Sequence, residues 1–141
     1  MKSILVIGMG RFGRQFAQRM LEYGNDVMII DKDPDLMDEL APQFTDAHIG
    51  DCSNEAVLTS LGINNFDLCF VTIGEDFQAS LEITSMLKEH GAKHVVSKAR
   101  TARQAALLSK IGADEVVCPE RDIADKLAVR YNADNIFDYI Q

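Results

Sequence analysis

The feature that most constrains the fold of this chain is a glycine-rich turn placed directly after a short apolar run. The turn reads Gly8-Met9-Gly10-Arg11-Phe12-Gly13, a complete G-x-G-x-x-G, and residues 4–7 before it are all apolar. In such a turn Gly8 permits the tight bend, Gly10 lets backbone amides approach a pyrophosphate, and Gly13 lets the next helix pack against the strand. The helix expected at residues 12–22 would present free N–H groups and a partial positive charge to phosphate. The segment therefore predicts a strand–turn–helix unit that binds a nucleotide.

An acidic residue follows the second apolar run, where a ribose-binding acid is expected. Asp31 lies 18 residues after Gly13, close to the spacing of about 20 residues found in dinucleotide-binding folds. A carboxylate there accepts hydrogen bonds from both ribose hydroxyls and repels a 2′-phosphate, so NADP is disfavoured. Lys32, a cation beside this acid, weakens the discrimination slightly.

Short apolar runs recur along the chain and are separated by segments of helical length and period. The runs do not alternate with polar residues, which is typical of strands buried on both faces of a parallel sheet. We predict six strands, at residues 3–7, 26–30, 47–49, 67–71, 94–97 and 115–117. Strand–helix alternation with short connections favours an α/β fold of the Rossmann-like doubly wound type, a six-stranded parallel sheet with helices on both faces.

The predicted helices carry recognisable end signals. A glycine, which supplies the left-handed residue that closes a helix, follows four of them, at Gly24, Gly62, Gly91 and Gly112. Polar residues are expected to cap the amino ends, namely Asp33 before Pro34, then Asp51 or Ser53, then Asp76, and finally Thr101. Residues 131–141 look less regular, and they include an apolar cluster that needs a partner, formed by Ile136, Phe137, Tyr139 and Ile140.

Size, charge and cysteine usage limit the classes of function. The 141 residues correspond to one domain, and 22 acidic against 14 basic residues give a net charge of −8. Such a chain is a poor general nucleic-acid binder, although a local basic pocket remains compatible with it. No apolar run approaches the roughly 20 residues that span a bilayer, so we expect no membrane insertion. Cys52, Cys69 and Cys118 have no metal-site or disulfide spacing and are expected to be buried thiols in a reducing cytosol.

Ligands of open α/β sheets bind beyond the carboxyl ends of the strands, so the residues after each strand are candidates. Arg11, inside the glycine turn, is either a phosphate clamp or a solvated first-turn arginine. Asp51 either accepts a hydrogen bond from an adenine amino group or caps a helix. Thr72 offers a hydroxyl, and Gly74 permits close approach of the chain to a ligand.

The last two strands are followed by further charged residues. Lys98 and Arg100 are two cations at the same sheet edge, suited to phosphate or ribose. Glu120 either binds a metal ion or ribose, or is a first-turn acid favoured by the helix dipole.

No catalytic set accompanies the nucleotide motif. The sequence has no Ser–His–Asp arrangement, no G-x-S-x-G and no P-loop, and the six strand–helix units use nearly all of the chain. We therefore predict a sensor rather than an enzyme, in which a ligand shifts the balance between two conformations. Two alternatives remain: the cofactor-binding half of an NAD-dependent oxidoreductase, and a stand-alone nucleotide-sensing or redox-sensing module.

These segments together resemble the KTN domain, which is the N-terminal RCK (TrkA-N) domain of Trk and Ktr potassium uptake regulators, and most of all the Ktr regulatory subunits. The resemblance covers essentially residues 1–141 as a single domain, without the C-terminal RCK domain that usually follows in the family. It rests on the glycine turn, Asp31, Gly50-Asp51, Thr72-Ile73-Gly74-Glu75-Asp76, Lys98-Ala99-Arg100, Ile111-Gly112-Ala113-Asp114-Glu115-Val116-Val117 and Pro119-Glu120.

The resemblance implies a cytoplasmic regulatory subunit that binds NAD(H), or ATP and ADP. Such subunits pair as homodimers, and the pairs are expected to assemble into an octameric ring. The ring gates a potassium-translocating subunit at the inner face of the cell membrane. Glu120 would then approach a divalent cation, Mg²⁺ or Ca²⁺, associated with ATP, and the apolar tail would find its partner in the dimer. Carried over by position, the cofactor-binding residues are Gly8, Met9, Gly10, Arg11, Phe12, Gly13, Asp31, Lys32, Asp51, Cys52, Thr72, Ile73, Gly74, Lys98 and Glu120.

Overall fold

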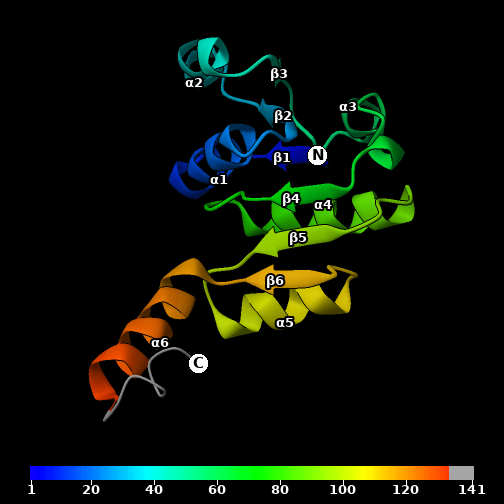
Figure 1. Ribbon diagram of the computed structural model, residues 1–141. Helices are drawn as coiled ribbons and strands as arrows, with labels where there is room; N and C mark the ends of the chain where they lie inside the picture. The colour runs from blue at the N-terminus through cyan, green and yellow to red at the C-terminus, as the bar shows by residue number, and fades with distance from the viewer. Residues whose placement is uncertain (134–141) are drawn as a thin grey trace.

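Six parallel strands form a single sheet in the computed structural model, which describes residues 1–133 (Figure 1). The strand order is β3-β2-β1-β4-β5-β6, so the chain starts in the middle of the sheet, builds one half and then crosses to the other. The predicted parallel sheet is confirmed, with strand ends displaced by no more than one residue. The strands are β1 (Ser3–Ile7), β2 (Asp26–Asp31), β3 (Asp46–Ile49), β4 (Leu68–Val71), β5 (Val95–Lys98) and β6 (Glu115–Val117).

Helices cover both faces of this sheet, as the continuous apolar strands predict. Helices α1 and α2 pack on one face, while α3, α4 and α5 pack on the other (Figure 1). None of the helices in the described part of the chain is long and apolar enough to cross a membrane. The helical elements are α1 (Arg11–Glu22), α2 (Pro34–Leu40), η1 (Ala41–Gln43), α3 (Glu55–Thr59), η2 (Ile63–Asn65), α4 (Phe77–Glu89), α5 (Ala102–Lys110) and α6 (Pro119–Asn132).

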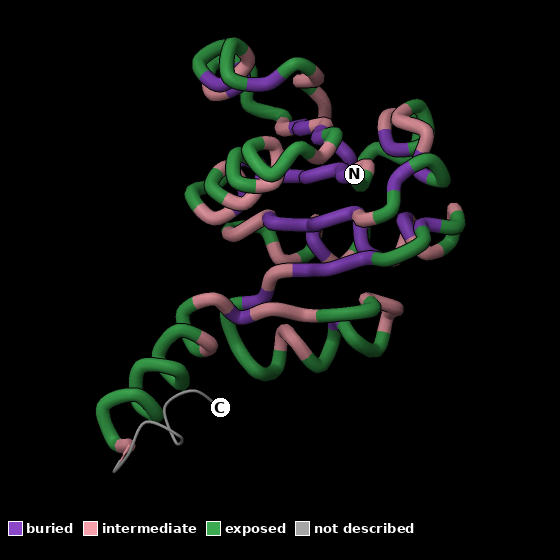
Figure 2. Tube along the Cα trace, viewed as in Figure 1, coloured by how far each residue is buried: buried purple, intermediate pink, exposed green. Residues whose placement is uncertain are grey.

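Successive residues of the central strand enter different cores. Ile4 and Val6 pack with residues of α1 and α2, whereas Leu5 and Ile7 pack with residues of α3 and α4. All four side chains are buried, and the buried segments in Figure 2 run through the middle of the sheet. A strand with an apolar environment on both sides has no polar face, which is why the sequence shows runs rather than alternation.

Most of the predicted helix ends are confirmed. All four predicted closing glycines have positive φ values, and the side chains of Asp33, Asp76 and Thr101 cap α2, α4 and α5. The prediction for α3 was wrong. Asn54 caps this helix by accepting from the Ala56 amide, because the Asp51 carboxylate is engaged by Ser53 one turn earlier.

Helix α6 projects from the end of β6 and stands away from the rest of the molecule (Figure 1). Its residues are almost all exposed (Figure 2), including the apolar side chains Ile123 and Leu127. Tyr131 still belongs to this helix, so the regular structure extends further than expected. The predicted apolar cluster of Ile136, Phe137, Tyr139 and Ile140 lies outside the described residues.

Candidate functional site

A pocket of about 890 Å³ opens at the carboxyl ends of the strands. It lies at the topological switch point between β1 and β4, from which successive strands are added first to one side of the sheet and then to the other. Open α/β sheets bind their ligands at this point. Its lining includes every predicted cofactor-binding residue except Gly13. The sequence did not single out several other lining residues for the site, among them Glu75, Ala79, Ile83 and Arg121.

The glycine turn forms the floor of this pocket. Gly8 has φ +98°, and a Cβ atom there would lie 3.2 Å from the Ile73 backbone nitrogen, so the turn fits closely against the chain after β4. Gly10 has no atom within 4 Å of its would-be Cβ and begins α1 without any side-chain cap. The first-turn N–H groups of α1 therefore remain available to an anion.

Gly13 acts in packing rather than in lining the pocket. A Cβ atom at Gly13 would overlap both the Gly8 carbonyl oxygen and the Thr72 hydroxyl oxygen. The third glycine of the motif thus allows α1 to approach the turn and β4 closely, as its place in the motif predicts.

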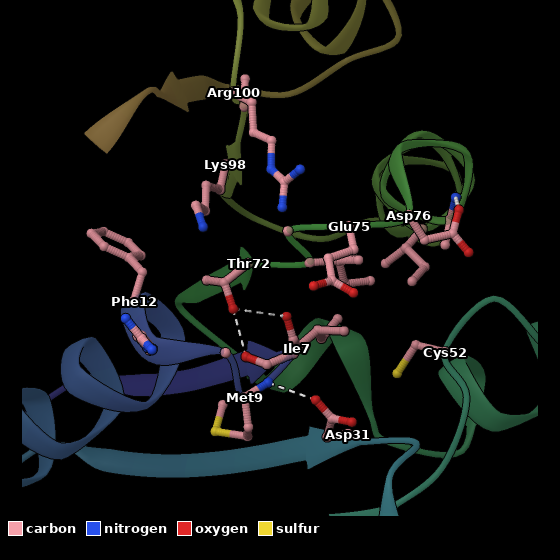
Figure 3. A pocket seen from close by; sticks show the side chains of 18 of the residues that line it. Ile7, Met9, Phe12, Asp31, Cys52, Thr72, Glu75, Asp76, Lys98 and Arg100 are labelled. Carbon is pink, nitrogen blue, oxygen red and sulfur yellow. Dashed lines mark hydrogen bonds between the residues drawn. The ribbon is translucent and has the colours of Figure 1, made fainter. Parts of the chain in front are cut away.

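The side chain of Thr72 fixes the position of the glycine turn. The side chain is buried, and its hydroxyl donates to the Gly8 carbonyl oxygen at 2.5 Å, with the Ile7 carbonyl oxygen at 3.2 Å (Figure 3). The sequence predicted a hydroxyl offered to the ligand. In the structure this hydroxyl donates to the backbone of β1 and the turn, so Thr72 positions the turn; Thr72 also lines the pocket, and its contact with a ligand stays a prediction.

Asp31 is held in place by two backbone donors. The Met9 N–H donates to Oδ2 at 2.7 Å, which ties the end of β2 to the glycine turn (Figure 3), and the Asp33 N–H donates to Oδ1 at 2.9 Å. These bonds fix the carboxylate at the pocket wall, in the place expected for a ribose-binding acid. Lys32 also lines the pocket and is exposed.

Asp51 has one oxygen engaged and lies farther along the same wall. Oδ1 accepts from the Ser53 hydroxyl at 2.6 Å and from the Ser53 N–H at 3.0 Å. These bonds to Ser53, the hydroxyl first, hold the pKa of the Asp51 carboxyl below its usual range. The charged carboxylate can only accept hydrogen bonds, so it suits an amino group such as that of adenine.

Cations gather on the opposite wall, beyond β5. Lys98 is half-buried and its Nζ lies 5.9 Å from the centre of the Phe12 ring, while Arg100 is exposed at the start of α5. Arg11 lines the same pocket from the first position of α1. Within residues 1–133, no carboxylate lies within 4.0 Å of the charged nitrogens of these three side chains.

Glu120 lies at the rim of the pocket, in the first turn of α6, and is exposed. Within the part of the chain that the structure describes, no group of three or more His, Cys, Asp or Glu side chains is placed to hold a metal ion. A cation at Glu120 would therefore need additional ligands, such as nucleotide phosphates or a second protein chain.

Two cysteines, Cys52 and Cys118, also line the pocket, and both are buried and free. Burial, reinforced by the negative charges of Asp51 and Asp31, raises the pKa of the Cys52 thiol to about 12. The neutral thiol packs against the core and is not poised for nucleophilic or redox chemistry. The buried state expected for all three cysteines is confirmed.

Comparison with known sequences identifies close relatives. The chain is 43% identical over 140 residues to Ktr system potassium uptake protein C of Bacillus subtilis, covering 99% of the chain and 63% of that protein. It is 35% identical over 127 residues to Ktr system potassium uptake protein A of Vibrio alginolyticus, covering 90% of the chain and 58% of that protein. The chain thus spans about three-fifths of the length of these relatives.

Solved structures share the fold at lower identity. The GsuK channel bound to NAD matches 92% of this chain with 23% of its own, at 15% identity and a TM-score of 0.81. The AMP-bound form of the Kef CTD of Shewanella denitrificans matches 92% of this chain with 79% of its own, at 23% identity and a TM-score of 0.76. Residues 4–119 match the TrkA-N domain. With the Rossmann-like sheet and its glycine turn, this match shows that the chain belongs to the TrkA-N domain family.

Proposed function

We propose that this chain is a nucleotide-binding regulatory domain that gates a potassium uptake system by sensing NAD(H) or the ATP/ADP pair. The observation that carries the proposal is the pocket itself. One cavity is lined by a helix N-terminus without a side-chain cap, by an acid held in the place of a ribose-binding acid, and by cations that make no ion pair within residues 1–133, in a chain 43% identical to a Ktr potassium uptake protein.

The adenosine half is the part of the ligand that the site supports best. Solved structures with the same fold are bound to NAD, ADP or AMP, and adenosine is common to these three ligands. Asp31 suits the ribose diol, Asp51 suits the adenine amino group, and the first turn of α1 suits the phosphate that follows.

A membrane partner and pairing with a second copy complete the proposal. We assign the chain to the cytoplasmic side of the membrane, where it would act on a potassium-translocating subunit. The exposed side chains of Ile123 and Leu127 line a shallow groove on α6 with Pro119, Glu120 and Ala124. Apolar side chains on a helix that stands away from its own domain suit the pairing of two copies into a dimer and then a ring. A divalent cation bound with ATP near Glu120 would fit this arrangement.

The test is nucleotide binding by calorimetry, using adenine nucleotides with and without the 2′-hydroxyl. Asp31→Asn should weaken binding of ATP and NADH by about tenfold, because a hydrogen bond to a charged acceptor is lost. It should have less effect on 2′-deoxy-ATP, which lacks one of the hydroxyls that Asp31 holds. Asp35→Asn is the matched control, because Asp35 is exposed in α2 and outside the pocket.

Two results would overturn parts of the proposal. If no adenine nucleotide binds saturably, the nucleotide-sensing function fails. If nucleotides bind but potassium uptake in a deficient host, reconstituted with the membrane subunit, does not respond to them, the gating role fails. Reduction of NAD with a small substrate would favour the oxidoreductase alternative instead.

A further inference from the structure

Helix α6 leaves the domain at the end of β6 without packing against the sheet (Figure 1). None of its residues is buried, and within residues 1–133 none of its side chains belongs to the hydrophobic clusters of the core. The residue just before it, Cys118, is 3% exposed and packs with Ala99 and Leu108. The direction of α6 relative to the sheet is therefore set by the backbone of residues 118–122, the corner at which the strand becomes the helix.

Two hydrogen bonds between the same two residues close this corner. The Asp122 N–H donates to the Cys118 carbonyl oxygen at 2.8 Å, and the Cys118 N–H donates to Asp122 Oδ2 at 3.1 Å. One bond lies on each side of the Cα atom of Cys118, so together they restrict both of its backbone dihedrals. The first is an ordinary helix bond that any residue at position 122 could make. The second depends on the side chain of Asp122.

The rest of the turn offers no substitute for this side chain. Cys118 is at the N-cap position, but its thiol is a weak acceptor and makes no capping bond, and Pro119 follows it without an N–H. From Glu120 to Asn132 every residue is exposed except Asp122, which is half-buried. A carboxylate that accepts from the N-cap N–H forms one half of a capping box, and its charge suits the positive end of the helix.

The same corner forms one wall of the nucleotide pocket. Residues 118–121 all line the cavity. The strand just before them is tied to the segment after β5, because the Ala99 N–H donates to the Val117 carbonyl oxygen at 2.8 Å. A ligand that contacts this wall and a partner that holds α6 would therefore act on the same few residues.

We propose that Asp122 sets the direction of α6 by holding Cys118, and that a nucleotide in the pocket changes this direction through the corner. The first part depends only on the contacts described above. The second part rests on the proposed nucleotide-binding function and adds the route by which the bound state reaches α6. A ligand redirects α6 only to the extent that it contacts the corner differently in the two directions. Asp122 bonds to the backbone and does not line the pocket, so it is a positioning residue.

The first experiment measures the direction of α6 without ligand. Spin labels at Lys126→Cys on α6 and Ser109→Cys on α5, both exposed positions, report the distance between helix and domain within one chain when unlabelled chain of the same variant is in excess. Asp122→Ala should broaden the distribution of this distance. Exchange of the Cys118 amide hydrogen should become about tenfold faster or more, because a hydrogen bond to a charged acceptor is lost. Asp122→Asn keeps an acceptor oxygen and should restore most of both properties.

Asp125→Ala is the matched control. It removes the same side chain from an exposed position in the next turn of α6 and should change neither the distance distribution nor the exchange at Cys118. The amide of Val6, in the central strand, should exchange equally slowly in all variants, which shows that the sheet is intact.

The second experiment adds ATP or ADP. In the unmodified chain at least one of the two nucleotides should shift the distance distribution. In Asp122→Ala this shift should be lost, while the Kd measured by calorimetry changes by no more than about threefold. The split between affinity and response separates a positioning role from a contact with the ligand, because the variant leaves Asp31 and the glycine turn untouched.

The outcomes separate this proposal from the proposed function. If Asp122→Ala matches Asp125→Ala in distance distribution and in Cys118 exchange, Asp122 does not set the direction of α6 and the proposal is refuted. If nucleotides bind but move α6 equally in the unmodified chain and in Asp122→Ala, or move it in neither, the coupling is refuted and nucleotide binding stands. If no nucleotide binds the unmodified chain, the proposed function and the coupling fail together, and the ligand-free distances still decide the role of Asp122.

Discussion

Removing the hydroxyl of Thr72 should damage the glycine turn without leaving a hole. Thr72→Val keeps the size and branching of the side chain but deletes the donor to the Gly8 carbonyl oxygen at 2.5 Å and to the Ile7 carbonyl oxygen at 3.2 Å. Ile7 also receives the Thr72 backbone N–H at 2.9 Å, so its oxygen remains satisfied. The main loss is therefore the buried bond to Gly8.

The magnitude follows from leaving one buried acceptor without a donor. Such a group costs about 1–3 kcal/mol of unfolding free energy, which corresponds to a fall in Tm of several degrees for a domain of this size. Urea unfolding followed by circular dichroism measures the change directly. Thr72→Ser is the matched control, since it keeps the hydroxyl and loses only a methyl group.

The ligand affinity supplies a second readout. Because the Gly8 carbonyl fixes the peptide that leads into the turn, Thr72→Val should also weaken ADP binding, and Thr72→Ser should retain most of it. If the unfolding free energy of Thr72→Val lies within about 0.5 kcal/mol of the unmodified chain, the usual range for an inconsequential substitution, the bond to Gly8 does not stabilise the turn. The same holds if the serine variant loses as much stability as the valine variant.

Three further predictions concern packing and titration. Gly13→Ala should lower the unfolding free energy by roughly 1–3 kcal/mol, because its methyl group overlaps Gly8 and Thr72, whereas Gly10→Ala, which meets nothing within 4 Å, should be close to neutral in urea unfolding. Burial raises the pKa of Cys52 and of Cys69 to about 12, so both should resist a thiol reagent at pH 8 in the folded chain and react in denaturant. Their raised pKa also means that the stability due to neutral thiols is complete below about pH 8.5 and is lost as the pH rises toward 12. Burial of Asp114 would raise its pKa, but hydrogen bonds from Lys88 and from the Val95 N–H outweigh burial and lower that pKa. The ionised carboxylate therefore contributes stability that is present above about pH 4 and is lost as the pH falls. Asp114→Asn should remove this contribution, and thermal unfolding between pH 2 and 7 would show the loss.

The sheet was predictable because its signals are local. A continuous apolar run indicates a strand, and a glycine such as Gly62 or Gly112 indicates the end of a helix, each from only a few residues of sequence. The cap of α3 was missed for the same reason. Asp51, Ser53 and Asn54 are all good capping residues, and only the three-dimensional turn shows that Ser53 engages Asp51 and leaves Asn54 to cap the helix.

The membership of the pocket was predictable from topology, but the roles of its residues were not. Parallel strands bring their carboxyl ends to one edge, so the residues after them had to meet. Whether a side chain faces the ligand or the protein depends on rotamers and neighbours that no spacing encodes. Thr72 turns its hydroxyl to the backbone, and Arg100 turns its guanidinium toward Gly74 across a gap of 26 residues in sequence.

The charge of the pocket is not the charge of the protein. A net charge of −8 is poorly matched to an anionic ligand, yet three of the five acids that line the pocket accept hydrogen bonds from the protein. Asp31 receives the N–H groups of Met9 and Asp33, Asp51 receives Ser53, and Asp76 receives the N–H of Ala79. Each carboxylate is thus partly compensated by the dipoles that hold it, whereas within residues 1–133 Lys98 and Arg100 have no carboxylate within 4.0 Å. Near Gly74 the nearest atoms beyond its chain neighbours are therefore cationic despite the overall count, and this is the part of the pocket where we expect the phosphates of the proposed nucleotide to meet positive charge.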